Sequence, residues 1–138
     1  MRRQTFKAIE DILRDYPDYD RYIAQREEAI LHPDILYAEE NIGGGRSSFI
    51  GRPTEMKGIT LAEDRALMLL KFQRDKIEKV INESDPITNQ IVREYYLTRP
   101  RTKTWAGVAK DIPMSESHCR RLRDGFFCRL SDELGFIR

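Results

Sequence analysis

Residues 104–122 read TWAGVAKDIPMSESHCRRL, and this stretch decides the fold. Apolar residues recur at helical spacing on both sides of a central proline: Val108, Ala109, Ile112, Cys119 and Leu122. Pro113 disfavours helical geometry at the residue before it, and Ser115 can cap a second helix by accepting a hydrogen bond from a free backbone N–H. We therefore predict a helix-turn-helix, a motif whose second helix enters the DNA major groove, with an ordinary helical hairpin as the alternative.

The composition is that of one soluble domain, with room for an attached arm. The chain has 138 residues, of which 40% are hydrophobic and 34% charged, which suffices for one modest core. No apolar run approaches the ~20 residues of a membrane span, and no apolar segment follows the charged start of the chain as a signal peptide requires. We expect a cytoplasmic protein with no membrane partner.

Positive charge is concentrated near the carboxyl end. Residues 99–129 hold eight basic and three acidic residues, a net charge of +5, whereas the whole chain has +1 and the rest of it therefore −4. A basic module in a nearly neutral chain is expected of a protein that contacts phosphate. A solvated basic face has the same composition and is the alternative.

The residue types needed for catalysis or metal binding do not occur in recognised arrangements. Cys119 and Cys128 are nine apart on one predicted helix, so they point in nearly opposite directions. The two histidines, His32 and His118, complete no metal-ligand spacing, and no nucleophile motif is present. We expect no enzyme, no metal and no cofactor. The acidic run at residues 15–20 is interpreted as a partly buried turn rather than a cation site.

The remaining patterns predict an all-α protein in three parts. Residues 1–37 form an N-terminal helical region, a hairpin of helices over 5–14 and 17–31. The glycine-rich segment 38–58 lacks the Gly-Lys-Ser/Thr ending of a phosphate loop, and we interpret it as a flexible linker. Residues 59–138 form a helical DNA-binding domain.

This third part is expected to contain a long helix, a short helix and the helix-turn-helix at 104–134. The long helix begins at a capping box of Thr60 and Glu63 and carries an apolar stripe that includes Leu69. Its length allows it to bridge the two helical parts or to pair with a second subunit, so a homo-oligomer is a candidate assembly. The short helix begins at Asp85 and Pro86, and its tyrosines are expected to pack behind the helix-turn-helix.

Two family resemblances support this arrangement. Residues 85–134 resemble region 4 of bacterial sigma factors: where these have Thr-Leu-x-x-Ile-Ala, this chain has Thr104-Trp105-x-x-Val108-Ala109, and the turn ends in a serine. Pro113 departs from the glycine of the sigma pattern. Nearly the whole chain resembles the RinA/ArpU group of phage late-transcription activators in four motifs: Asp15-Tyr-Pro-Asp-Tyr-Asp20, Asn41-Ile-Gly-Gly, Glu94-Tyr-Tyr96 and Leu130-Ser-Asp-Glu-Leu-Gly135. This resemblance implies an activator of phage packaging and morphogenesis genes that binds DNA in a bacterial host cell.

The sigma resemblance also implies DNA contacts by position. The residues that follow the cap of the second helix are expected in the major groove: Glu116, Ser117, His118, Arg120 and Arg121. One of the two arginines can read guanine through two parallel hydrogen bonds, and Glu116 can accept from cytosine. Four other basic residues suit phosphate contacts: Arg99, Arg101, Lys103 and Lys110. Arg123 and Arg129 lie further along the helix and are expected to face the DNA backbone or solvent.

Three functions are compatible with these observations. The first is a sequence-specific activator that binds double-stranded DNA and contacts bacterial RNA polymerase through another surface. The second is a sigma-like factor bound to the polymerase, which the lack of an aromatic-rich promoter-melting region argues against. The third is a phage small terminase subunit, although these usually place the DNA-binding module before the oligomer-forming part, the reverse of the order here.

Overall fold

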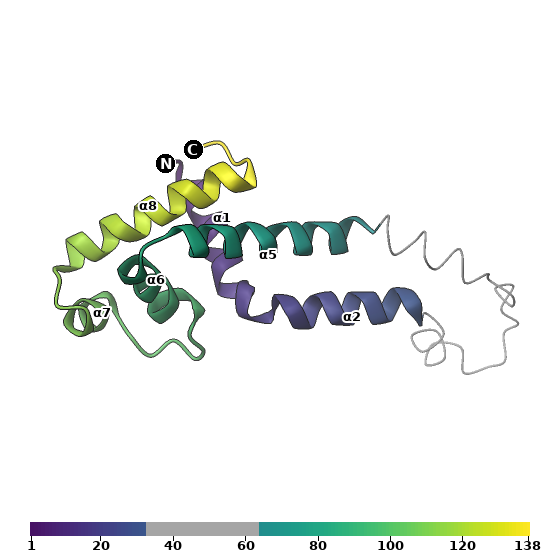
Figure 1. The fold of residues 1–138 in the computed structure, drawn as a ribbon, viewed down its shortest axis with the longest axis horizontal. Coiled ribbons are helices and arrows are strands. Elements are labelled where there is room, and N and C mark those ends of the chain that lie inside the picture. Colours follow the sequence, from purple (N-terminus) through teal and green to yellow (C-terminus); the bar gives the residue numbers. More distant parts are fainter. Residues whose placement is uncertain (33–63) are drawn as a thin grey trace, which may run out of the picture. The chain divides into compact units, whose positions relative to one another are not determined.

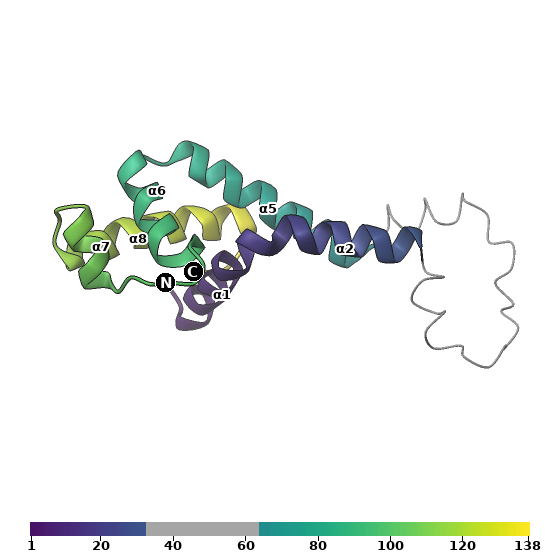
Figure 2. The same ribbon diagram turned by 90° about the horizontal axis from the view of Figure 1, so that it is seen from below.

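The computed structural model describes residues 1–32 and 64–138, and every regular element in these ranges is helical. The predicted all-α fold class is confirmed. The α-helices, shown in Figures 1 and 2, are α1 (Arg3–Asp15), α2 (Tyr19–Leu31), α5 (Arg65–Glu83), α6 (Pro86–Val92), α7 (Trp105–Asp111) and α8 (Glu116–Leu134). A 3₁₀ turn, η1 (Tyr16–Asp18), follows α1, and a π-helical turn, η2 (Arg93–Leu97), follows α6. The predicted linker at 38–58 and the capping box at Thr60 lie outside the described residues.

The chain divides into two compact units. The first comprises Met1–Asp18 with Gln73–Arg138, and the second comprises Tyr19–Phe72. The boundary between the units falls inside the predicted N-terminal helical region at residues 1–37. The reason is that α1 belongs to the core of the first unit: Ile9 and Leu13 are fully buried. The ring of Phe6 in α1 also lies 4.9 Å from that of Phe127 in α8.

Helix ends in the first unit follow local sequence signals. Asp85 caps α6 by accepting from the Thr88 backbone N–H (3.0 Å), and Ser115 caps α8 by accepting from that of His118 (3.1 Å). Gly135 ends α8 in the left-handed conformation, with a φ of 76°, which glycine adopts without steric cost. These three predicted ends are confirmed. Thr104 also acts as a cap, which was not predicted: its hydroxyl accepts from the Gly107 backbone N–H at the start of α7.

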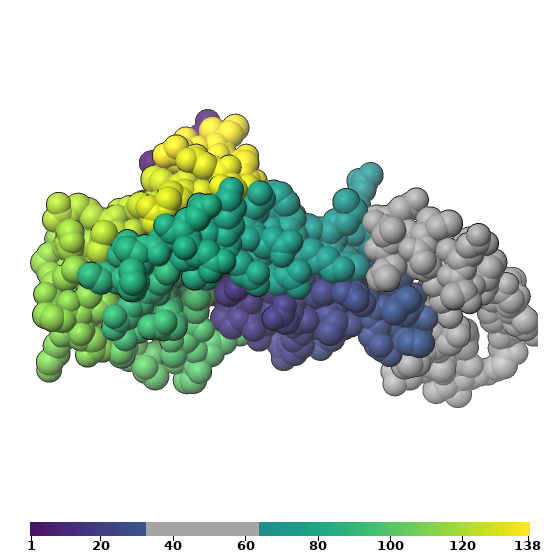
Figure 3. Space-filling model, viewed as in Figure 1, coloured from purple at the N-terminus to yellow at the C-terminus, as the bar shows by residue number. Residues whose placement is uncertain are grey.

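The two ends of the chain meet on the first unit. Figure 3 shows residues from the amino end beside the last residues of the chain. The Thr5 hydroxyl donates to the Ile137 carbonyl (2.5 Å), and Lys79 of α5 donates to Glu133 of α8 (2.7 Å). α8 is therefore held along its length by α1, α5, α6 and α7. None of the helices in the described ranges has the length and apolarity that crossing a membrane requires.

The second unit contains α2 and the first turns of α5. Arg26 donates to both carboxylate oxygens of Asp64, with a shortest distance of 2.6 Å, and the same carboxylate accepts from the Leu67 backbone N–H. The Arg26 hydrogen bond is the main reason that the pKa of Asp64 is lowered. Leu69, a member of the predicted apolar stripe, is 55% exposed, whereas Leu67, which the stripe left out, is buried. Residues 66–70 are apolar on all sides of the helix, so spacing alone does not select a face.

Candidate nucleic-acid interface

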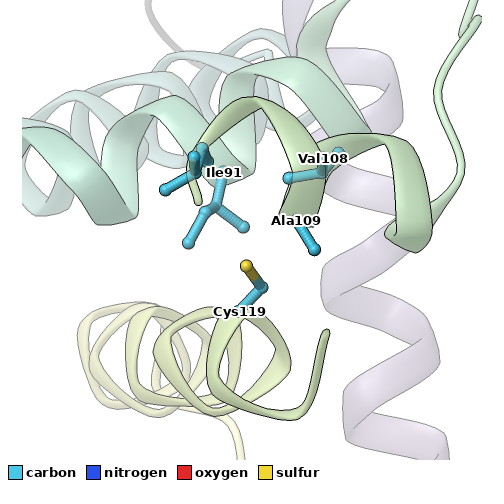
Figure 4. Close-up of a cluster of buried hydrophobic side chains, with 5 residues drawn as sticks. Ile91, Val108, Ala109 and Cys119 are labelled. Carbon is cyan, nitrogen blue, oxygen red and sulfur yellow. The ribbon is translucent and has the colours of Figure 1, made fainter. Parts of the chain in front are cut away.

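A small apolar core joins α6, α7 and α8. Its buried members, four of which are labelled in Figure 4, are Ile91, Val108, Ala109, Ile112 and Cys119. The Cys119 side chain points from α8 toward the other members, and burial is the first cause of the raised pKa of its thiol. The apolar faces predicted for the two helices are thus confirmed. Because this core fixes α8 against α7, the outward face of α8 has a defined orientation on the first unit.

The turn between α7 and α8 occupies residues 112–115. The Met114 backbone N–H donates to the Ala109 carbonyl (3.1 Å), which closes the chain back on the end of α7. Ile112, the residue before Pro113, leaves helical geometry with a φ of −99° and a ψ of 8°, as expected of a residue that precedes proline.

The start of α8 presents an exposed polar face. All five residues predicted to enter the major groove are exposed: Glu116, Ser117, His118, Arg120 and Arg121. The Arg121 Nε lies 3.5 Å from the Ser117 carbonyl of its own helix, at the limit of a hydrogen bond. These side chains are therefore brought together on the surface, on the helix whose opposite side is anchored by Cys119.

Arg123 lies inside the first unit, so the prediction that it faces the DNA backbone or solvent is wrong. Only 9% of the residue is exposed. Its Nη1 donates to the Tyr96 hydroxyl (3.0 Å) and its Nε to Asp124 (2.7 Å). The guanidinium also lies against the rings of Phe6 (4.8 Å) and Trp105 (4.9 Å). Residue 123 is four positions after Cys119 and four before Phe127, so its helix position assigns it to the buried face despite its charge.

The buried Tyr96 hydroxyl links α1 to α8. It accepts from Arg123 and donates to Glu10 Oε1 of α1 (3.0 Å). Burial is the main cause that raises the pKa of Tyr96 far above its ordinary value, so the phenol stays neutral and keeps its donor. Burial alone would lower the pKa of Arg123, but the hydrogen bonds to Tyr96 and Asp124 outweigh it and the pKa is raised. The network is thus built around a charged guanidinium.

The four basic residues predicted to bind phosphate fall into two groups. Arg99 pairs with Asp18 and donates to the Arg14 carbonyl, and Lys103 bridges Glu94 (3.0 Å) and Asp111. Hydrogen bonding to Asp111 and Glu94 raises the pKa of Lys103. The other two residues, Arg101 and Lys110, are exposed and have no carboxylate partner among the residues described.

An aromatic pair lies next to the start of α8 and was not predicted from the sequence. Tyr95 of η2 and Trp105 of α7 stack with ring centroids 4.1 Å apart and 18° between their planes. Arg101 lies over the Tyr95 ring (4.9 Å), and Arg120 of α8 lies over Trp105 (5.8 Å). The signal was the tryptophan itself, because it occupies the place of a leucine in the sigma pattern. A leucine fills a core but offers no face to a cation.

Comparison with known proteins places the chain in a family. Residues 6–132 match the family model described as "Protein of unknown function (DUF722)". The chain is also 30% identical over 136 residues to the transcriptional activator rinA of Staphylococcus phage phi11, across 98% of this chain and 94% of that protein. The chain belongs to the RinA-like family of phage transcriptional activators. Its relative is a regulator of transcription, which agrees with the expectation that the chain is not an enzyme.

No solved structure matches this RinA-like chain, so the resemblance to sigma region 4 stays a prediction. Motifs that carried the RinA-like resemblance have structural roles. In Glu94-Tyr-Tyr96, the first residue binds Lys103, the second stacks on Trp105 and the third binds Arg123. In the acidic motif at residues 15–20, Asp18 pairs with Arg99. The Asn41 motif lies outside the described residues.

Proposed function

We propose that this RinA-like protein is a sequence-specific DNA-binding activator of phage late packaging and morphogenesis genes. In this proposal α7 and α8 act as a helix-turn-helix, and the start of α8 reads the major groove of double-stranded DNA. The observation that carries the proposal is the exposed face of Ser117, His118, Arg120 and Arg121 on a helix whose other side is locked into the core. A face of this kind suits base contacts, because side chains early in a recognition helix reach the base edges.

The roles of the cations are divided by their partners. Arg121 is the best candidate to read a guanine, because its exposed guanidinium has only a long contact with its own helix. Lys110 is exposed and suits phosphate, which fixes position without specifying sequence. Arg99, Lys103 and Arg123 serve the protein's own structure, since each is paired with a carboxylate of the first unit.

Footprinting on the DNA that adjoins the coding gene provides the test substrate, because it gives the site, its length and its symmetry together. Affinity is then measured on the protected duplex and on a random duplex by fluorescence anisotropy. We expect Arg121→Ala to weaken binding to the protected site by ~1–3 kcal/mol and to relax selectivity at one base pair. Arg129→Ala is the matched control, because this exposed arginine lies later on the same helix and bonds to Ser84.

If Arg121→Ala weakened binding to the protected and the random duplex equally, the base-reading role would be contradicted. If the wild-type protein protected no DNA, the proposed function itself would be contradicted. Transcription in vitro separates the activator from a sigma-like factor. An activator stimulates polymerase only when the housekeeping sigma factor is present, whereas a sigma-like factor directs core polymerase without it. Rings of eight or more subunits would indicate a small terminase subunit instead.

A further inference from the structure

We infer that the Tyr95–Trp105 stack, with Arg101 and Arg120 over its rings, is a preformed clamp for the phosphodiester backbone of duplex DNA. This inference rests on the proposed function and deepens it. It assigns Arg120 to the backbone and leaves Arg121 to the bases, a division that the adjacent positions of the two arginines in the sequence do not reveal. The four residues of the clamp all belong to the first unit.

The clamp is a stack of two rings, each with an exposed guanidinium over it. Trp105 covers one face of the Tyr95 ring, so Arg101, at 4.9 Å from the centroid of that ring, takes the other face. Two guanidinium groups lie over the indole ring of Trp105: that of the buried Arg123 at 4.9 Å and that of the exposed Arg120 at 5.8 Å. The stack therefore joins the 98–104 loop to the exposed start of α8.

The two exposed arginines of the clamp are neutralised by no carboxylate of the described ranges. This distinguishes them from Arg99, Lys103 and Arg123 in the same unit, whose charges are paired. Arg101 and Arg120 are also exposed, so the stack holds two uncompensated positive charges at the surface. An anionic partner is what such charges bind.

The stacked arrangement suits phosphate better than base edges. A guanidinium that rests on a ring face keeps its N–H groups free around its edge, where they can donate to phosphate oxygens. Stacking also restricts the side chain before binding, so less rotamer freedom is lost when the contact forms. Arg121 has no such ring beneath it and can extend into the groove.

The test removes one arginine of the clamp and keeps the rest. Arg101→Gln is compared with Arg2→Gln, which removes the same charge from an exposed position at the start of α1. Binding to the protected duplex and to a random duplex is measured from low to high salt. We expect Arg101→Gln to weaken binding to both duplexes by the same factor, roughly three- to tenfold at low salt, and to reduce the salt slope of binding by about one. Arg2→Gln should leave both unchanged.

A second variant tests the rings. Trp105→Phe keeps an aromatic face and should bind DNA as the wild type does. Trp105→Leu introduces the residue of the sigma pattern, which has no aromatic face, and should weaken binding to both duplexes equally. Circular dichroism checks that each variant is folded, and Arg101→Gln gives the decision by itself if Trp105→Leu does not fold.

Three results would overturn the clamp. These are an unchanged salt slope in Arg101→Gln, a loss confined to the protected duplex, and a loss of polymerase activation with DNA affinity intact. The last result would make the stack a protein-contact surface. If the wild-type protein binds no duplex at all, the proposed function fails and not the clamp alone.

Discussion

Replacing Tyr96 by phenylalanine tests the buried network that joins α1 to α8. The substitution removes one oxygen, which accepts from Arg123 Nη1 and donates to Glu10 Oε1, both at 3.0 Å. Tyr96 is 2% exposed, so water does not replace the missing partner of the guanidinium. A hydrogen bond to a charged group contributes ~1.5–3 kcal/mol, and Glu10, which is only partly buried, can regain water. We expect Tyr96→Phe to lower the free energy of unfolding by about 2–3 kcal/mol.

The neighbouring tyrosine supplies the matched control. Tyr95→Phe makes the same chemical change, but the Tyr95 hydroxyl has no hydrogen-bond partner in the described part of the chain. We therefore expect it to lower the free energy of unfolding by less than ~0.5 kcal/mol. Urea unfolding followed by fluorescence measures both, because Trp105 is the only tryptophan of the chain and lies in the same unit. The network would be refuted if the two phenylalanine variants were equally stable.

A double-mutant cycle isolates the bond itself. Arg123→Met removes the buried charge together with its contacts to three rings, and it leaves Tyr96 bonded to Glu10. In this background Tyr96→Phe leaves no buried guanidinium without a partner, so the loss in unfolding free energy should fall to about 1 kcal/mol or less. Equal costs in both backgrounds would show that Tyr96 and Arg123 are not coupled.

Four further substitutions follow from two helix ends, a glycine within α8 and an ion pair. Asp85→Ala should lower the unfolding free energy by ~1 kcal/mol at pH 7 through loss of the cap. Because the Thr88 hydroxyl and backbone hold the pKa of Asp85 below its ordinary value, this difference should shrink in urea titrations as the pH falls below about 4. Gly125→Ala should raise the melting temperature, with a gain of up to ~1 kcal/mol, because an added Cβ would meet only the Arg129 side chain, at an ordinary van der Waals distance of 3.8 Å. Gly135→Ala should lower the melting temperature, because a φ of 76° is strained for any residue with a Cβ. Lys103→Ala should leave the salt slope of DNA binding unchanged. It should also lower the free energy of unfolding at neutral pH, because the ion pairs of Lys103 raise its pKa in the folded state. This difference from the wild type should disappear as the pH rises through that raised pKa.

The sequence could predict what depends on neighbours along the chain. The ends of α6 and α8 were predictable because a cap needs only one side chain and a backbone N–H three residues on. The core around Cys119 was predictable because apolar spacing on α7 and α8 leaves one way to pair them. The unit boundary at Asp18 was not, because it depends on contacts of α1 with residues more than 80 positions away, such as the bond from Tyr96 to Glu10.

The candidate site was predicted less completely, because charge was taken as a sign of exposure. That assumption holds for Arg120 and Arg121 and fails for Arg123, whose aromatic surroundings come from α1, α7 and α8 together. Lys103 was assigned to phosphate because its partner Glu94 lies in another element and no local pattern links them. Spacing places a residue on a face of its helix, but only the fold shows what covers that face.

The pairing of cations changes what the net charge of +5 predicts for DNA binding. If all eight basic residues of 99–129 bound phosphate, the salt slope on B-DNA would be about −7 per bound chain. Arg99, Lys103 and Arg123 are held by carboxylates and Arg129 bonds to Ser84, which leaves Arg101, Lys110, Arg120 and Arg121. With Arg121 reading a base, three phosphate contacts remain and the expected slope is about −3 per chain. Anisotropy titrations at several salt concentrations, with the stoichiometry fixed by ultracentrifugation, measure it. A slope near −7 would mean that the internal ion pairs open on DNA, and the separation of structural from binding cations would then be wrong.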